Sequence, residues 1–146
     1  MDYAYNIKDD LLSKRNCRSK DIVELLISKN NNIKTLNFCK NVLSEVKTDD
    51  EFFEDIVHVF KSRARLVPDA YLIDKENKAI VCYEVEDTHP LNDKKILKYT
   101  DIFWALDEIY WDLILITYDI FGNTSYINVV NCGLILDLNN IDNHNA

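Results

Sequence analysis

The hydrophobic period of the chain changes near Arg65, and this change limits the folds that the chain can adopt. Before Arg65, apolar residues recur every three or four positions, as on one face of an amphipathic helix. After Arg65, they gather in short runs rich in aromatic and β-branched residues, as in buried strands. The sequence therefore predicts a helical front part and a back part that is mostly sheet.

The front part predicts helices over 19–29 and 33–47, with Thr35 as a cap of the second. The run Thr48-Asp49-Asp50-Glu51 fits a capping box and opens a third helical stretch that reaches Phe60. The back part predicts strands over 66–73 and 79–86 joined in a hairpin, a helix over 93–106, and strands over 111–118 and 125–130. This order predicts an α/β fold, a small mixed β-sheet flanked by helices.

A chain of 146 residues, 47% of them hydrophobic, can build one core and hardly two. We expect a single domain over 1–138, with a helical part over 1–60, a sheet core over 61–131 and a flexible tail over 139–146. The chain has only two glycines, which excludes a P-loop and a dinucleotide-binding loop. Each of those loops needs a cluster of glycines beside the phosphate.

The four cysteines are widely spaced, and no CxxC pair occurs. This spacing argues against a disulfide scaffold and a CxxC zinc site, and favours reduced thiols in a cytoplasmic protein. The opening residues lack the basic-then-apolar pattern of a secretory signal. No apolar run approaches ~18 residues, so we expect no membrane partner.

Charge is unevenly distributed along the chain. Residues 1–67 hold 12 Lys and Arg against 11 Asp and Glu, whereas residues 68–146 hold 5 against 14. The net charge of −8 argues against a protein that simply coats nucleic acid. The acidic back half indicates either ordinary acidic solubility or an acidic functional site.

Carboxylates are concentrated near one end of the expected hairpin. Glu84 and Glu86 lie two positions apart on an apolar strand, so their side chains point to the same face. Asp69 belongs to the partner strand and can converge on the same point. Neighbouring like charges in an apolar strand need compensation, and three hard oxygen ligands suit Mg²⁺. The alternative is that both glutamates lie on the solvated face of a half-exposed strand.

Pro68-Asp69, the hairpin and Glu84-Val85-Glu86 together resemble the motif of the PD-(D/E)xK nuclease superfamily. The 15-residue gap from Asp69 to Glu84 is typical of that superfamily, and the expected element order over about residues 48–131 is similar to its core. The resemblance implies a restriction-endonuclease-like fold and a metal-dependent nuclease.

The resemblance also implies roles for single residues. Asp69 and Glu84 would bind Mg²⁺ or Mn²⁺, with the backbone carbonyl of Val85 as a third ligand. Glu86 takes the place of the usual lysine, which orients or activates the attacking water. A minority of restriction enzymes have glutamate there.

Many members of the superfamily also carry a glutamate on the helix before the first strand. Glu54 is the best match for this additional metal ligand, with Glu51 and Glu45 behind it. This position is the loosest part of the resemblance, because the three glutamates are spread over two predicted helices.

The helix after the two glutamates resembles the QxxxY element of the exonuclease branch, with lysine in place of glutamine. Lys95 and Tyr99 are i,i+4 neighbours on one face of this helix. Either Lys95 or Lys98 could supply the positive charge that Glu86 does not. The alternative is that these lysines form a solvated helix face and that Tyr99 belongs to the core.

Two basic clusters could contact nucleic-acid phosphates, which supplies affinity and not sequence choice. Residues Lys61, Arg63 and Arg65 alternate before the first strand and would share one face in an extended segment. The second cluster consists of Lys14, Arg15, Arg18 and Lys20. The helices over 19–29 and 33–47 could also form a helix-turn-helix, although neither has the polar character of a recognition helix.

These expectations describe a nuclease that hydrolyses phosphodiester bonds in DNA with Mg²⁺ or Mn²⁺ as cofactor. A homodimer would suit cleavage of both strands. One alternative is a catalytically inactive binding protein of the same fold, which takes DNA or a protein partner as small phage and mobile-element proteins often do. Another is a transcriptional regulator that binds DNA through its N-terminal helices.

Overall fold

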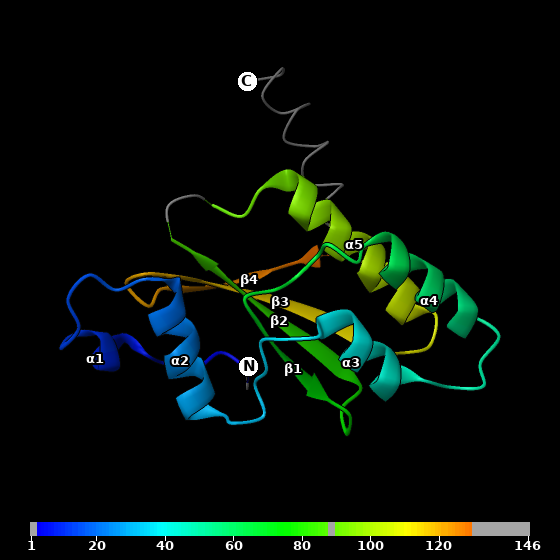
Figure 1. Ribbon diagram of the computed structural model, residues 1–146, viewed down its shortest axis with the longest axis horizontal. Helices are drawn as coiled ribbons and strands as arrows, with labels where there is room; N and C mark the ends of the chain where they lie inside the picture. The colour runs from blue at the N-terminus through cyan, green and yellow to red at the C-terminus, as the bar shows by residue number, and fades with distance from the viewer. Residues whose placement is uncertain (1–2, 88–89, 130–146) are drawn as a thin grey trace, which may run out of the picture.

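A computed structural model describes residues 3–87 and 90–129 of the chain. These residues form five helices and four strands, in the order α1 Lys8–Leu11, α2 Ser19–Lys29, α3 Phe38–Val46, α4 Phe53–Ser62, β1 Ala70–Asp74, β2 Ala79–Glu86, α5 Asp93–Asp107, β3 Asp112–Asp119 and β4 Thr124–Ile127 (Figure 1). The tail expected over 139–146 and residue Val130 lie outside the described residues. The last strand ends at Ile127, so the expected extension of this strand towards Val130 is wrong. Within the described part, no helix is long and apolar enough to cross a bilayer.

The four strands form one sheet in the order β1-β2-β3-β4. β1 and β2 pair as an antiparallel hairpin, β2 and β3 are parallel, and β3 and β4 are antiparallel. The parallel pair requires a crossover connection, which contains α5. The chain is therefore a mixed α/β protein with a mixed sheet, as the change in hydrophobic period predicts.

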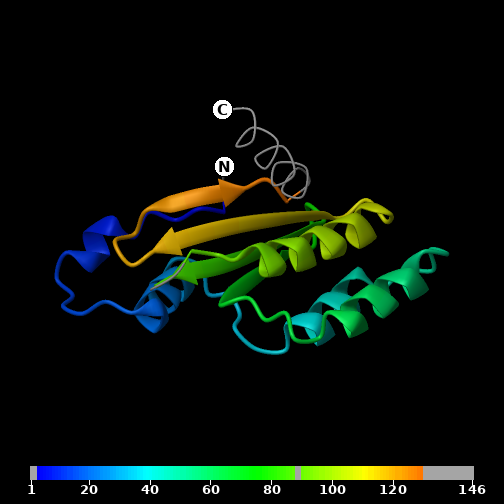
Figure 2. The same ribbon diagram turned by 90° about the horizontal axis from the view of Figure 1, so that it is seen from above.

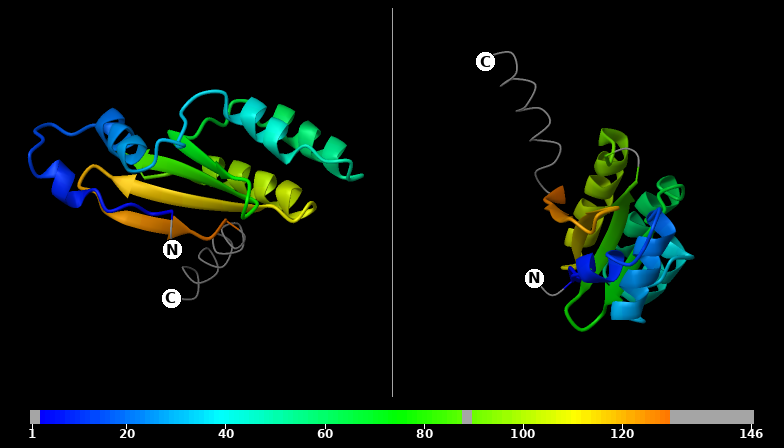
Figure 3. Two further views of the ribbon diagram at one scale, coloured as in Figure 1. Left: turned by 90° about the horizontal axis from the view of Figure 1, so that it is seen from below. Right: turned by 90° about the vertical axis from the view of Figure 1, so that its left-hand side faces the viewer.

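Helices cover both faces of this sheet, because its two central strands are apolar on both sides. On one face, α3, α4 and α5 pack against strand side chains that include Tyr71, Cys82 and Leu115. On the other face, the N-terminal segment and α2 pack against strand side chains that include Val81 and Tyr118. Figures 2 and 3 show α4 and α5 side by side, with α1 and α2 towards the other end of the sheet.

The expected ranges match the structure best in the central elements. The bounds of α2 and β2 are the predicted 19–29 and 79–86, and α5 and β3 begin and end within one residue of their predicted ranges. The apolar residues of these elements follow long, regular patterns, and such patterns are the strongest sequence signal of secondary structure.

Two helices begin later than the sequence predicts. α3 begins at Phe38, because the residues before it are tied to β1: Lys34 and Tyr71 form a backbone bridge, and the Tyr71 hydroxyl donates to the Leu36 carbonyl. α4 begins at Phe53, and the expected capping box at Thr48 is wrong. Instead, Asp50 Oδ1 accepts from Phe52 N at 2.9 Å in the turn before the helix.

β1 begins at Ala70 and not at Leu66. The chain is still turning at Leu66, whose N–H donates to the Arg63 carbonyl at 2.8 Å, and Pro68 has no N–H to give to a strand ladder. The cluster Lys61, Arg63 and Arg65 therefore lies on the end of α4 and the turn after it. The segment is not extended, so the proposed shared face is absent there.

The alternative that the first two long helices form a helix-turn-helix is also wrong. The buried residues of α2, Ile22 and Leu26, pack on one face of the sheet, whereas those of α3 belong to the core on the opposite face. A helix-turn-helix needs two helices that pack on each other. In this fold, the sheet separates α2 and α3.

Candidate active site

The hairpin brings Asp69 to the end of β2. Ala70 pairs with Tyr83, so Asp69 comes next to Glu84 and Val85, where the ladder of β1 ends. Asp69 is half-buried, and its Oδ2 accepts a hydrogen bond from Val85 N at 2.7 Å. The carboxylate thus satisfies a backbone donor that β1 no longer reaches, and its remaining lone pairs can accept from another group.

Glu84 is the buried acid of this region, with 4% of its surface exposed. Its side chain lies on the face covered by α5, where Lys95 Nζ is 2.9 Å from its Oε1 and the Tyr99 hydroxyl donates to its Oε2. Burial raises the pKa of the Glu84 carboxyl above its ordinary value. The hydrogen bonds from Tyr99 and Lys95 oppose this rise, and the nearby Asp69 adds to it. Both oxygens of Glu84 therefore have a protein partner.

The start of α5 places Lys95 and Tyr99 beside Glu84. Asn92 is the N-cap of this helix, and its Oδ1 accepts from Lys95 N at 2.8 Å. Lys95 and Tyr99 are one turn apart on the same face. Burial raises the pKa of Tyr99 well above its ordinary value, so its hydroxyl remains a hydrogen-bond donor at neutral pH.

These groups line one cavity of about 250 Å³ at the carboxyl end of β2. The charged side chains in its wall are those of Asp69, Glu84, Glu86 and Lys95; Val85 and residues 90–92 complete it. The wall therefore joins three carboxylates and one ammonium group, with Glu84 at the buried side. The juxtaposition of Asp69, Glu84 and Glu86 agrees with the sequence-based expectation.

The donor set fits a small hard cation in its chemistry, because carboxylate oxygens are the preferred ligands of Mg²⁺. Asp69 and Glu84 are close enough that Asp69 raises the pKa of Glu84. The Lys95 ammonium supplies the countercharge in this arrangement. Among residues 3–87 and 90–129, no group of three or more His, Cys, Asp or Glu residues has the geometry to hold a metal ion. A metal ion at Glu84 Oε1 would have to replace Lys95, whose Nζ lies 2.9 Å from that oxygen.

The residue expected to be an additional metal ligand lies elsewhere. Glu54 is exposed in the first turn of α4 and is not part of the wall of this cavity. α4 runs antiparallel to α5, since Arg63 at its end contacts Asp101 while Asp55 at its start shares a cavity with Glu108. The start of α4 therefore faces the end of α5 that is remote from Lys95.

Lys98 and the two weaker glutamate matches also lie outside the wall. Lys98 is half-buried on α5 but does not line the cavity. Glu51 is exposed in the turn before α4, and Glu45 pairs with Lys75 at 3.6 Å. Of the two candidate lysines, the structure brings Lys95 to the carboxylates.

The second basic cluster lies next to the residue that follows β2. It surrounds the start of α2, where Ser19 Oγ donates at 3.2 Å to Asp87, the residue after β2. Arg15, Arg18 and Lys20 are exposed there. In the first cluster, the Arg63 guanidinium is held by Asp101, with Nε 3.0 Å from Oδ2.

Sequence reasoning missed the structural contributions of Asn92 and of the Val85 N–H. Asn92 directly precedes the predicted helix, and asparagine is a preferred N-cap, so this signal was present in the sequence. The bond from Val85 N to Asp69 depends on where the β1 ladder ends, for which the sequence holds no clear signal. Comparison of the chain with models of protein families, with curated proteins and with solved structures gives no match.

Proposed function

We propose that this protein is a metal-dependent nuclease of restriction-endonuclease-like architecture that hydrolyses phosphodiester bonds in DNA. One observation carries the proposal: Lys95 Nζ lies 2.9 Å from Glu84 Oε1 in a cavity that Asp69 and Glu86 also line. The sequence motif has Glu86 where a lysine is usual. A lysine from α5 at the same carboxylates supplies the cation that the motif lacks.

Each residue of the cavity has a role in this proposal. Asp69 and Glu84, with the Val85 carbonyl, would hold Mg²⁺ or Mn²⁺. A divalent cation bound there supplies Lewis acidity towards the phosphate and lowers the pKa of a bound water. Glu86 would accept a hydrogen bond from the attacking water and take up its proton. Lys95 would stabilise the negative charge that grows on the phosphate oxygens.

Tyr99 would act as a positioning residue. Its hydroxyl donates to Glu84 Oε2 from a fully buried side chain, which fixes the orientation of the carboxylate. With Glu84 engaged as a metal ligand, the Lys95 ammonium would be free to contact substrate. The ion pair of Lys95 and Glu84 would thus keep a positive charge beside the position that the proposal gives to the substrate phosphate.

The test combines thermal melting with cleavage of labelled DNA, in the presence of Mg²⁺ or Mn²⁺ at millimolar concentration. The metal should raise the melting temperature of the wild type but not of Asp69→Asn, because a ligand that binds only the folded state stabilises it. Cleavage should be lost in Asp69→Asn and Glu84→Gln. Asparagine at position 69 can still accept from Val85 N, so the fold should persist.

Glu108→Gln is the matched control, since it removes an exposed carboxylate at the far end of α5. It should keep both the metal response and the cleavage activity. Full cleavage by a folded Glu84→Gln protein would overturn the proposal. So would a metal response that Asp69→Asn leaves unchanged.

A second candidate function is that of a catalytically inactive binding protein of the same architecture. It is favoured by the hydrogen bonds of Glu84, because its two carboxylate oxygens already accept from Lys95 and Tyr99 and are not free to bind a metal ion. In that case, Glu84→Gln should leave DNA binding unchanged, and no cleavage should occur with any divalent metal. The cleavage assay, together with a measurement of DNA binding, therefore separates an enzyme from a binding protein.

A further inference from the structure

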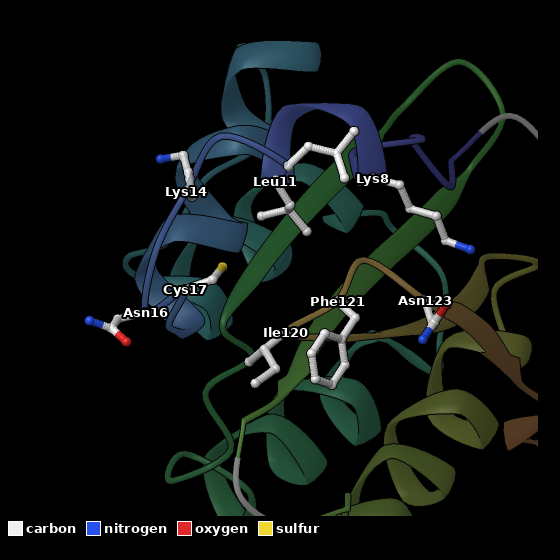
Figure 4. A pocket seen from close by; sticks show the side chains of 9 residues that line it. Lys8, Leu11, Lys14, Asn16, Cys17, Ile120, Phe121 and Asn123 are labelled. Carbon is white, nitrogen blue, oxygen red and sulfur yellow. The ribbon is translucent and has the colours of Figure 1, made fainter.

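A groove of about 530 Å³ lies between the α1 region and the turn that joins β3 to β4. In Figure 4, Ile120 and Phe121 of the turn face Leu11 across the groove. Lys8 and Asn123 lie towards one end of the groove, and Lys14, Asn16 and Cys17 lie towards the other. No residue of this groove belongs to the wall of the acidic cavity.

The groove is a formed feature with fixed walls. Gly122 has φ +83°, and a Cβ at this position would come within 3.1 Å of the side chains of Leu11 and Lys8, so α1 packs closely on the turn. Asp119 Oδ1 accepts from the N–H groups of Phe121 and Asn123 at 2.8 and 2.9 Å. The Phe121 ring is therefore presented by a turn whose backbone is held in place.

The groove exposes large apolar side chains between two lysine side chains. Phe121 is 72% exposed and Leu12 is 84% exposed. Lys8 and Lys14 are the charged side chains in the lining, within a chain whose net charge is −8. Lys14 has Asp21 at 3.9 Å, a long contact that leaves its ammonium accessible. Many proteins bind unpaired nucleotides through an exposed aromatic ring flanked by basic residues. The bases stack on the ring, and the phosphates lie near the cations.

The groove and the acidic cavity both lie at the carboxyl end of the parallel pair of strands β2 and β3. Glu86 of the cavity pairs in register with Asp119, which directly precedes Ile120 of the groove. Neighbouring strands lie about 5 Å apart. A second link runs through Asp87, which follows Glu86 and accepts a hydrogen bond from Ser19, two residues after Cys17 of the groove. The groove belongs to the face that the N-terminal segment covers and the cavity to the face that α5 covers, so a polynucleotide that contacts both passes round this end of the sheet.

We propose that this groove binds the unpaired nucleotides of a single-stranded nucleic acid, with a base stacked on Phe121 and phosphates beside Lys8 and Lys14. The proposal deepens the proposed nuclease function and rests on it for the class of substrate. A single-stranded end held in the groove would lead its chain towards Asp69, Glu84 and Glu86. The protein would then act on ends, flaps or other unpaired segments in preference to continuous duplex.

Binding is tested on the full chain by fluorescence anisotropy of a labelled oligothymidylate and of a blunt duplex of equal length. The buffer contains EDTA, so that cleavage plays no part. The wild type should bind the single strand more tightly than the duplex. Phe121→Ala should weaken binding of the single strand roughly fivefold or more, because a stacked base depends on the ring.

Two further variants sharpen the test. Trp104→Ala removes a half-exposed aromatic ring on α5, outside the groove, and should bind as the wild type does. The double variant Lys8→Gln and Lys14→Gln should reduce the slope of log affinity against log salt by roughly 1.4, as expected for two lost phosphate contacts on a single strand. Circular dichroism checks that each variant keeps the fold.

Several outcomes would overturn the proposal. These are wild-type binding that prefers duplex or is undetectable, an unchanged affinity in Phe121→Ala, or competition by polyglutamate as effective as that by unlabelled oligothymidylate. The last result would identify the groove as a site for acidic peptides. Cleavage that depends on Glu84 but not on Phe121 would reject the groove and keep the nuclease. Phe121-dependent binding without any cleavage would keep the groove and reject the nuclease.

Discussion

At the scale of single residues, the contacts of Glu84 explain how a carboxylate can be buried in the sheet. Tyr99 is fully buried and donates to Glu84 Oε2, while Lys95 covers Oε1 from the more exposed side. A buried charge is tolerated when hydrogen bonds satisfy it, and removal of one partner leaves it uncompensated. The stability of the fold should therefore respond to the partners of Glu84.

Replacement of Tyr99 by phenylalanine tests this response, because it keeps the ring and removes the hydroxyl. The free energy of unfolding at pH 7 should fall by about 1.5–3 kcal/mol, the usual contribution of a hydrogen bond to a charged group. Urea denaturation measures the change. Tyr110→Phe is the control, since Tyr110 is 85% exposed, and it should stay within about 0.5 kcal/mol of the wild type. Equal effects of both substitutions would contradict a special role for Tyr99.

The raised pKa of Glu84 predicts a dependence of stability on pH. Between about 4.5, the ordinary value for glutamate, and the higher pKa in the folded state, the folded protein keeps a proton that the unfolded chain releases. Stability from this group is complete below about 4.5 and is lost as the pH rises through the folded-state pKa. Glu84→Gln lacks this titration, so its melting temperature relative to the wild type should rise from pH 4 to pH 7.

Glu86→Gln provides the comparison for this pH series, because it removes one charge from the same cavity at a half-buried position and leaves the hydrogen bond from Tyr99 to Glu84 in place. A relative melting temperature of Glu84→Gln that falls or stays level between pH 4 and pH 7 would contradict the assignment. The comparison with wild type at each pH cancels the titration of groups that do not interact with Glu84.

At the scale of the elements, the start of α5 decides where Lys95 lies. Asn92→Ala removes the N-cap bond to Lys95 N and should lower the free energy of unfolding by about 1 kcal/mol, the typical effect of losing a cap. Asn92→Ser keeps a side-chain acceptor and should restore most of the loss. Chemical denaturation of the three proteins measures both changes. A serine variant as unstable as the alanine variant would show that Asn92 does not act as a cap.

The elements also show what local sequence can and cannot predict. The central strand β2 and the helix α5 follow from dense or periodic runs of apolar residues, and the proximity of Asp69 to Glu84 follows once the hairpin is paired. The choice of Lys95 over Lys98 does not follow, because it depends on how α5 is rotated on the sheet. The predicted start of a helix is wrong where a long-range contact holds the preceding residues in another conformation. The hydrogen bond from Tyr71 to the Leu36 carbonyl does this before α3.

At the scale of the whole molecule, the N-terminal segment belongs to the core of the sheet. The Tyr83 hydroxyl donates to the Tyr3 carbonyl at 2.7 Å, and the Tyr118 hydroxyl donates to the Tyr5 carbonyl at 2.8 Å. These bonds join residues 80 and 113 positions apart in the chain. No local sequence pattern predicts such long-range contacts. For this reason the sequence does not predict that residues before α2 cover this face of the sheet.

Because both helical layers pack on one four-stranded sheet, they should unfold together. Leu26→Ala removes a fully buried side chain of α2 on the face opposite Trp111, which belongs to the core under α3, α4 and α5. The free energy of unfolding should fall by about 2–5 kcal/mol, as for other leucines truncated in a core. In urea, tryptophan fluorescence and far-ultraviolet circular dichroism should shift to the same lower midpoint, since two-state unfolding gives coincident transitions. If helical signal is lost first while the tryptophan signal keeps the wild-type midpoint, the α2 layer unfolds independently, and a groove built partly on the segment before α2 could open without disturbing the acidic cavity.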